Sequence, residues 1–220
     1  MKRFLTLACL AAMVFAAPSA HAVATLQLSS GATTVTITDG LLGLDLNPNP
    51  GWVTYIGSIG NFTVNVSTGT TAGGTAVMPY LDLNSIDTSS AAGGVLTLAF
   101  SETGYTSLFP VQLAIGGTTP GTVSYSAYYD VGNVALAQTT LIGTLGPYGG
   151  PAFSGAGTFG YTPTTPYSLT EVVTVNHAGS GTSSFDASLQ AVYIPEPGTM
   201  MLLGSGLIGL AAWGRKKVRK

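Results

Sequence analysis

The stretch GTVSYSAYYD, residues 121–130, alternates between apolar and polar side chains and decides the fold class. One set consists of Val123, Tyr125, Ala127 and Tyr129, and the other of Ser124, Ser126 and Tyr128. Successive side chains of a β-strand point to opposite faces of the sheet. The period of two therefore predicts a strand with one buried face and one face in water.

The same alternation recurs along the chain, in TTVTITD (33–39), NFTVNVS (61–67) and SLTEVVTVNH (168–177). Between these runs lie clusters of turn residues such as NPNPG (47–51), GGTTPG (116–121) and GPYGGP (146–151). Glycine allows a positive φ and proline fixes φ, so such clusters end strands and form turns. Residues 23–193 are therefore predicted to form one all-β domain, an antiparallel β-sandwich of the jelly-roll-like or Ig-like kind.

The charge of this body excludes one class of partner. Residues 23–194 contain no Lys or Arg, and eight of the nine acidic residues lie there. Binding to nucleic acid depends on cations that replace the counterions of the phosphates. We therefore expect no nucleic acid partner.

The N-terminal residues 1–22 have the three parts of a secretory signal peptide. Lys2 and Arg3 give a charged start, an apolar run follows, and Ala20-His21-Ala22 forms a small-x-small cleavage site. Cys9 is the only cysteine and would leave with this peptide. An extracellular body without thiols or disulfides is expected.

Catalytic side chains are scarce in the body, and we expect a protein that is not an enzyme. His177 is its one histidine, and its place between a strand and a glycine turn predicts an exposed turn residue. Asp130 or Asp186 could complete a Ser-His-Asp arrangement, but the sequence has no G-x-S-x-G motif. Few carboxylates are present for glycoside hydrolysis.

One segment has the spacing of a calcium loop. Asp45, Asn47 and Asn49 place oxygen-bearing side chains at alternate positions. Pro50 stands where such a loop has its glycine, and Ile56 stands where it has the bidentate Glu. Asx turns explain the pattern equally well. No cofactor is predicted, and calcium is the one candidate ion.

Two aromatic residues are candidates for contact with carbohydrate. Trp52 lies in a turn-rich segment, and Tyr128 falls on the face opposite Tyr125 and Tyr129. Exposed aromatic rings on a sheet can stack against sugars. The alternative is that tyrosines are simply good strand residues with a polar tip.

The chain ends with PEPGTMMLLGSGLIGLAAWGRKKVRK, residues 195–220. An uncharged run over residues 199–214 predicts a single C-terminal transmembrane helix, short for a hydrocarbon core of about 30 Å. The basic tail at 215–220 predicts that this end stays inside and that the body lies outside.

Pro195, Glu196, Pro197 and Gly198, followed by an apolar helix and a basic tail, resemble the PEP-CTERM sorting signal of Gram-negative bacteria. The resemblance covers residues 194–220. It implies processing by an exosortase, with the precursor transiently in the inner membrane and the mature protein at the cell surface or outside the cell. It also implies a non-enzymatic surface or matrix protein associated with exopolysaccharide or biofilm. The alternative function is a secreted carbohydrate-binding module or a glycosidase-like domain.

Overall fold

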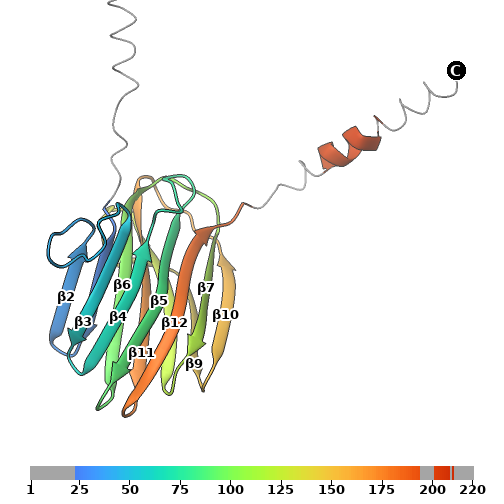
Figure 1. Cartoon of the computed structure of the whole chain (residues 1–220). Coiled ribbons are helices and arrows are strands. Elements are labelled where there is room, and N and C mark those ends of the chain that lie inside the picture. Colours follow the sequence, from blue (N-terminus) through green and yellow to red (C-terminus); the bar gives the residue numbers. More distant parts are fainter. Residues whose placement is uncertain (1–22, 194–200, 209, 211–220) are drawn as a thin grey trace, which may run out of the picture.

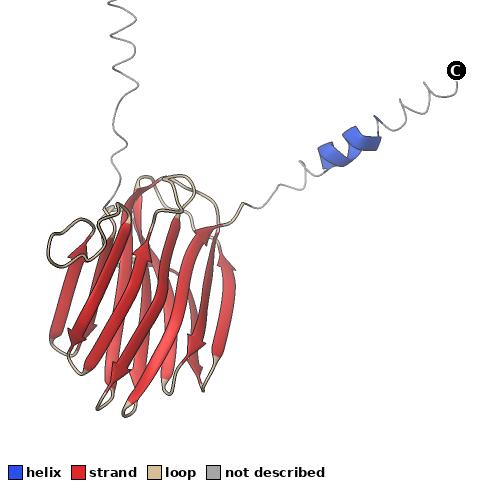
Figure 2. Cartoon of the chain, viewed as in Figure 1, coloured by secondary structure: helices blue, strands red, loops and turns tan. Residues whose placement is uncertain are grey.

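The computed structural model describes residues 23–193, 201–208 and 210, and residues 23–193 form two packed antiparallel sheets (Figures 1 and 2). The first sheet, here called the groove sheet, runs in the order β10 (Phe153–Phe159), β7 (Val111–Thr118), β12 (Gly181–Ala191), β5 (Tyr80–Ser90), β4 (Phe62–Thr70) and β3 (Trp52–Ile59). The second, the back sheet, runs in the order β2 (Thr33–Thr38), β1 (Thr25–Ser30), β6 (Gly94–Tyr105), β11 (Tyr167–His177), β8 (Thr122–Asp130) and β9 (Thr140–Gly149). These sheets confirm the predicted antiparallel β-sandwich.

The strand order selects between the two kinds of sandwich that the sequence left open. From β5 to β12 the chain changes sheet at every connection except the β8–β9 hairpin. This alternation is that of an eight-stranded jelly roll. The first four strands extend it: β1 and β2 lengthen the back sheet beside β6, and β3 and β4 lengthen the groove sheet beside β5.

The two ends of the sandwich differ. Short turns join the strands at one end, called the turn end: residues 31–32, 60–61, 91–93, 119–121, 150–152 and 178–180. Longer connections lie at the other end, called the loop end: residues 39–51, 71–79, 106–110, 131–139 and 160–166. The strand β12 ends at the loop end (Figure 1).

The core follows the predicted alternation. Val123, Tyr125 and Ala127 of β8 are buried, as are Leu169 and Val173 of the neighbouring β11. Apolar side chains from both sheets fill the space between the layers, with Phe62 and Phe100 among the largest that are fully buried. Burial of these faces supplies the main stabilisation of the fold.

A carboxyl group lies inside this core. Glu171 of β11 is fully buried, and its Oε2 accepts a hydrogen bond of 2.7 Å from the Tyr125 hydroxyl. Its Oε1 has no hydrogen-bond partner among the described residues. Burial raises the pKa of Glu171 well above its ordinary range, because the body has no Lys or Arg to pair with it.

The C-terminal prediction is only partly covered by the described residues. Residues 201–208 and 210 are helical, within the predicted segment 199–214. Among the described residues, no helix has the length and apolar character to cross a membrane. The signal peptide at 1–22 and the motif at 195–198 lie outside the described residues.

Candidate functional site

A row of residues in direct register crosses the outer face of the groove sheet. The paired positions are Ala156, Ala114, Ser188, Asp82, Thr70 and Trp52, one from each strand from β10 to β3. Neighbouring strands lie roughly 4.8 Å apart, so this row spans about 24 Å across the strands. The row is long enough to hold an extended chain molecule.

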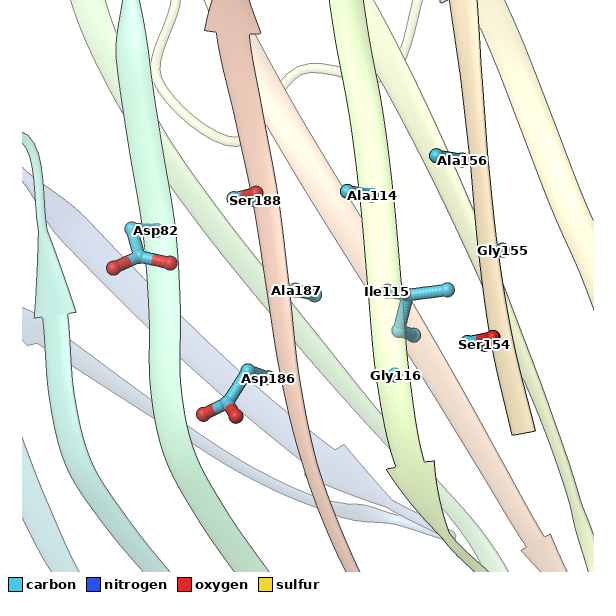
Figure 3. A pocket seen from close by; sticks show the side chains of 10 residues that line it. All are labelled: Asp82, Ala114, Ile115, Gly116, Ser154, Gly155, Ala156, Asp186, Ala187 and Ser188. Carbon is cyan, nitrogen blue, oxygen red and sulfur yellow. The ribbon is translucent and has the colours of Figure 1, made fainter. Parts of the chain in front are cut away.

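Two adjoining hollows lie along this row and share Asp82, and together they are called the groove. The first has a volume of about 540 Å³ and extends from β10 to β5. The second has a volume of about 460 Å³ and lies between Trp52, Tyr80 and Asn84. The first is a wide depression, because its outward positions carry small side chains, which Figure 3 shows on β7, β10 and β12. The residues of these positions are Ala114, Gly116, Ser154, Ala156 and Ser188.

Two carboxylates from neighbouring strands stand at the centre of the groove (Figure 3). Asp82 belongs to β5 and Asp186 to β12. The register of these strands shifts beside Asp186, so Asn84 and Ser85 lie opposite a single residue. Ser85 has a positive φ of 52°, and its backbone N–H donates to Asp186 Oδ1 at 2.6 Å. This bulge holds the Asp186 carboxylate in place.

Asp82 is held by polar neighbours on its own strand. Its carboxylate accepts side-chain hydrogen bonds from Tyr80 and Asn84. Partial burial raises the pKa of Asp82, and the nearby Asp186 adds to this rise, while the two hydrogen bonds oppose it. Burial and the same hydrogen bond to Asp82 raise the pKa of Tyr80 to about 12, so its hydroxyl remains a donor at neutral pH.

The structure separates the two aromatic residues that the sequence singled out. Trp52 begins β3 and lines the groove, with 36% of its surface exposed. Tyr128 lies on β8, which belongs to the back sheet, and therefore does not line this groove. Tyr80 is the second aromatic residue that lines the groove.

The candidate calcium segment lies in the loop 39–51, where its oxygens accept backbone N–H groups. Asp45 Oδ1 accepts from Asn47 at 2.9 Å and from Thr54 at 3.1 Å, and Oδ2 accepts from Gly40 at 3.0 Å. Asn47 Oδ1 accepts from the backbone of Asn49 at 3.0 Å. These bonds form the Asx turns of the alternative interpretation. Calcium binding at this segment stays a prediction.

The prediction of an exposed His177 is wrong. Only 2% of its surface is exposed, and both ring nitrogens have partners. Nδ1 lies 2.8 Å from Ser90 Oγ, and Nε2 lies 2.7 Å from Ser183 Oγ, which donates to Thr119 Oγ1. The strands β5, β11 and β12 surround the ring, so residues distant in sequence bury a side chain that its local turn would expose.

Reasoning from the sequence did not identify Asp82 and Asp186 as members of one site. Their strands are adjacent in the sheet, but more than a hundred positions separate the two residues in the chain. The alternation of each strand indicates an outward side chain, but which strands pair cannot be read from it. The small residues Ala114 and Gly116 have no distinctive pattern of their own.

The solved structures that match the chain include the following three, all at low similarity. The enzymatically active domain of tailspike protein 4 from bacteriophage CBA120 has 18% identity and a TM-score of 0.35, covering 62% of this chain and 20% of that one. TmCBM61, solved with β-1,4-galactotriose, has 9% identity and a TM-score of 0.36, covering 62% and 92%. The K2 cleaved adhesin domain of Lys-gingipain has 11% identity and a TM-score of 0.37, covering 70% and 95%. No curated protein sequence matches the chain.

The C-terminal segment gives a specific match. Residues 194–216 match the model of the PEP-CTERM protein-sorting motif. This motif indicates an exported protein that an exosortase sorts to the cell surface. The match confirms the resemblance seen in Pro195-Glu196-Pro197-Gly198 and the residues that follow. By this segment the chain is a PEP-CTERM sorting domain-containing protein.

Proposed function

We propose that the protein is an exported surface protein that binds an uncharged polysaccharide along the groove, without breaking it down. The groove carries this proposal. It crosses the whole sheet, its floor is formed by small residues, and an exposed indole ring stands at one end. Aromatic rings bind the flat faces of sugars, and fixed polar groups orient their hydroxyls.

The polar groups of the groove favour a ligand rich in hydrogen-bond donors. Asp82 and Asp186 accept hydrogen bonds and cannot donate them when ionised. No Lys or Arg exists in the body to bind a carboxylate or sulfate of the ligand. An acidic polysaccharide would therefore bring negative charge beside two carboxylates, whereas the hydroxyls of an uncharged one donate to them.

A glycosidase is the second candidate, because two carboxylates face the same hollow. The raised pKa of Asp82 is a property of a general acid, and Asp186 would then serve as the second carboxylate. Release of reducing ends from a bound polysaccharide, abolished by Asp82→Asn, would support this candidate. Binding of the polysaccharide without any release of reducing ends would support a binding protein that is not a glycosidase.

Affinity electrophoresis of the exported protein tests the proposal. Gels that contain an uncharged glucan, mannan or galactan are compared with gels that contain polygalacturonate. We expect at least one uncharged polymer to retard the protein, and Trp52→Ala to weaken this about tenfold, since stacking contributes about 0.5–1.5 kcal/mol beyond the buried area. Tyr128→Ala on the back sheet is the matched control and should behave as wild type. An equal loss of retardation with both variants would contradict the assignment of the binding site to the groove.

The sorting signal suggests where in the cell this binding takes place. We propose that exosortase processing delivers the domain to the cell surface, where it associates with exopolysaccharide or a biofilm matrix. The presence of the sorting motif supports the route, and the groove supports the partner. Deletion of residues 195–198 should leave the protein unprocessed while its groove still binds polysaccharide.

A further inference from the structure

The exposed apolar side chains of the body gather at the loop end of the sandwich. Nine large ones lie in four of its loops, and the turns of the opposite end have none among the described residues. The nine are Leu41, Leu42, Leu44, Leu46, Val77, Met78, Leu108, Val131 and Val134. Single exposed apolar residues are normal on proteins, but their concentration at one end marks a contact surface.

The loops of this end are joined to one another. The backbone of Thr71 donates to Gly51 O at 2.9 Å, which joins loop 71–79 to loop 39–51. Thr106 donates to Ala76 O at 2.7 Å, which joins loop 106–110 to loop 71–79. Leu42, with 96% of its surface exposed, and Leu108, with 67%, therefore belong to one connected set of loops.

The chain leaves the body from within this same surface. Ala191 donates to Pro79 O at 2.9 Å, and Val192 donates to Pro110 O at 2.8 Å. The rings of Phe109 and Tyr193 meet edge to face, with centroids 5.6 Å apart. The exit strand is thus bound to loops 71–79 and 106–110, directly beside their apolar residues.

The apolar segment of the sorting signal begins close to this exit. Six residue steps separate Tyr193 from Thr199, and a fully extended chain covers at most about 22 Å over that length. If residues 199–214 enter a bilayer, the loop end faces that bilayer at short range. The turn end, on the far side of the sandwich, cannot face it at the same time (Figure 1).

We propose that in the unprocessed protein the loop end rests on the lipid bilayer, with the exposed side chains of loops 39–51, 71–79 and 106–110 inserted at its surface. Because the body has no Lys or Arg, this contact depends on apolar insertion and gains nothing from anionic lipid. It would hold Pro195–Pro197 at the membrane surface. The first hollow of the groove is lined by strands on the side of the sandwich and stays open to polysaccharide, whereas the second hollow borders the contact through Ala72 and Gly73 of loop 71–79.

A fluorescent probe at single cysteines tests the contact. The full chain carrying Cys9→Ser has no other cysteine, so Leu42→Cys, Leu108→Cys and Ala92→Cys each give one labelling site. Ala92 lies in an exposed turn at the turn end and is the matched control. Each labelled chain is reconstituted into phosphatidylcholine vesicles that contain a headgroup-proximal spin-labelled lipid.

We expect at least threefold stronger quenching at positions 42 and 108 than at position 92. Quenching at position 42 should fall to the level of position 92 in a Leu41→Asn, Leu44→Asn, Leu108→Asn background, because the apolar side chains make the contact. Equal quenching at positions 42 and 92 would overturn the proposal. So would strong quenching that survives the asparagine substitutions, since tethering alone would then explain it. Quenching that needs no spin-labelled lipid and increases with the concentration of labelled protein would overturn the proposal and assign this surface to self-association.

Discussion

Replacing Glu171 with glutamine should change how the stability of the protein depends on pH. The carboxyl lies in the core with one hydrogen bond, from Tyr125, and without a cation in the whole body. Glutamine has nearly the same shape and keeps an oxygen to accept from Tyr125. It cannot ionise.

The magnitude follows from the proton that the buried carboxyl retains. Burial raises the folded-state pKa well above the ordinary value of 4.5, so between these two values the folded protein holds a proton that the unfolded chain has lost. The contribution of Glu171 to the free energy of unfolding therefore falls as pH rises, by about 1.4 kcal/mol per pH unit, until the folded-state pKa is reached. The Glu171→Gln variant lacks this loss.

Chemical unfolding in urea between pH 4.5 and 7.5 measures the difference. We expect the stability of Glu171→Gln relative to wild type to grow as pH rises above 4.5, with a slope that approaches about 1.4 kcal/mol per pH unit and levels off at the folded-state pKa. The buried amide NH2 of the glutamine changes the free energy of unfolding by the same amount at every pH. The quantity to compare is therefore the slope of this free energy against pH. Asp87→Asn, at an exposed position of β5, is the control and should keep the wild-type slope. Parallel curves for wild type and Glu171→Gln would refute the reasoning.

Three further predictions concern a glycine, a histidine and the sorting signal. Gly117→Ala should destabilise the fold by about 2–3 kcal/mol, since its methyl group would overlap the Ser184 carbonyl. Gly116→Ala makes only ordinary contacts, with Phe153 O at 3.6 Å and Ser154 Cβ at 3.7 Å, and should be nearly neutral in thermal unfolding. Burial lowers the pKa of His177, so at this site the unfolded chain binds more protons below pH 6.5, and the contribution of His177 to stability falls as pH decreases there. The stability of His177→Gln relative to wild type should therefore rise as pH decreases below 6.5, and a constant difference would contradict this. Intact-mass measurement of the surface protein should find no Arg215–Lys220, and a mature species that retains them would exclude exosortase processing.

Much of the fold could be predicted because it is encoded locally. The alternation in β8 and β11 indicates which residues face the core, and it even places Glu171 on the buried face together with Leu169 and Val173. Strand pairing is different, since β5 and β12 are joined by a register that no local pattern contains. The choice between a jelly roll and an Ig-like sandwich therefore required the structure.

The candidate site could be predicted only in part for the same reason. Trp52 was identified by its residue type, and the structure places it in the groove. Tyr128 satisfied the same criteria but lies on the other sheet. Asp82 and Asp186 become neighbours only through the β5–β12 pairing. His177 is buried because residues of other strands, among them Ser90 and Ser183, lie against its ring.

The most direct measurement for the groove as a binding site is the fluorescence of Trp52 during titration with a retarding uncharged polysaccharide. Trp213 is the only other tryptophan, so a Trp213→Phe chain reports on Trp52 alone. The account predicts a saturable change in emission that Gly116→Leu, which fills the first hollow, weakens at least tenfold. Polysaccharide binding that leaves the emission of Trp52 unchanged and is unaffected by Gly116→Leu would place the ligand elsewhere and contradict the account.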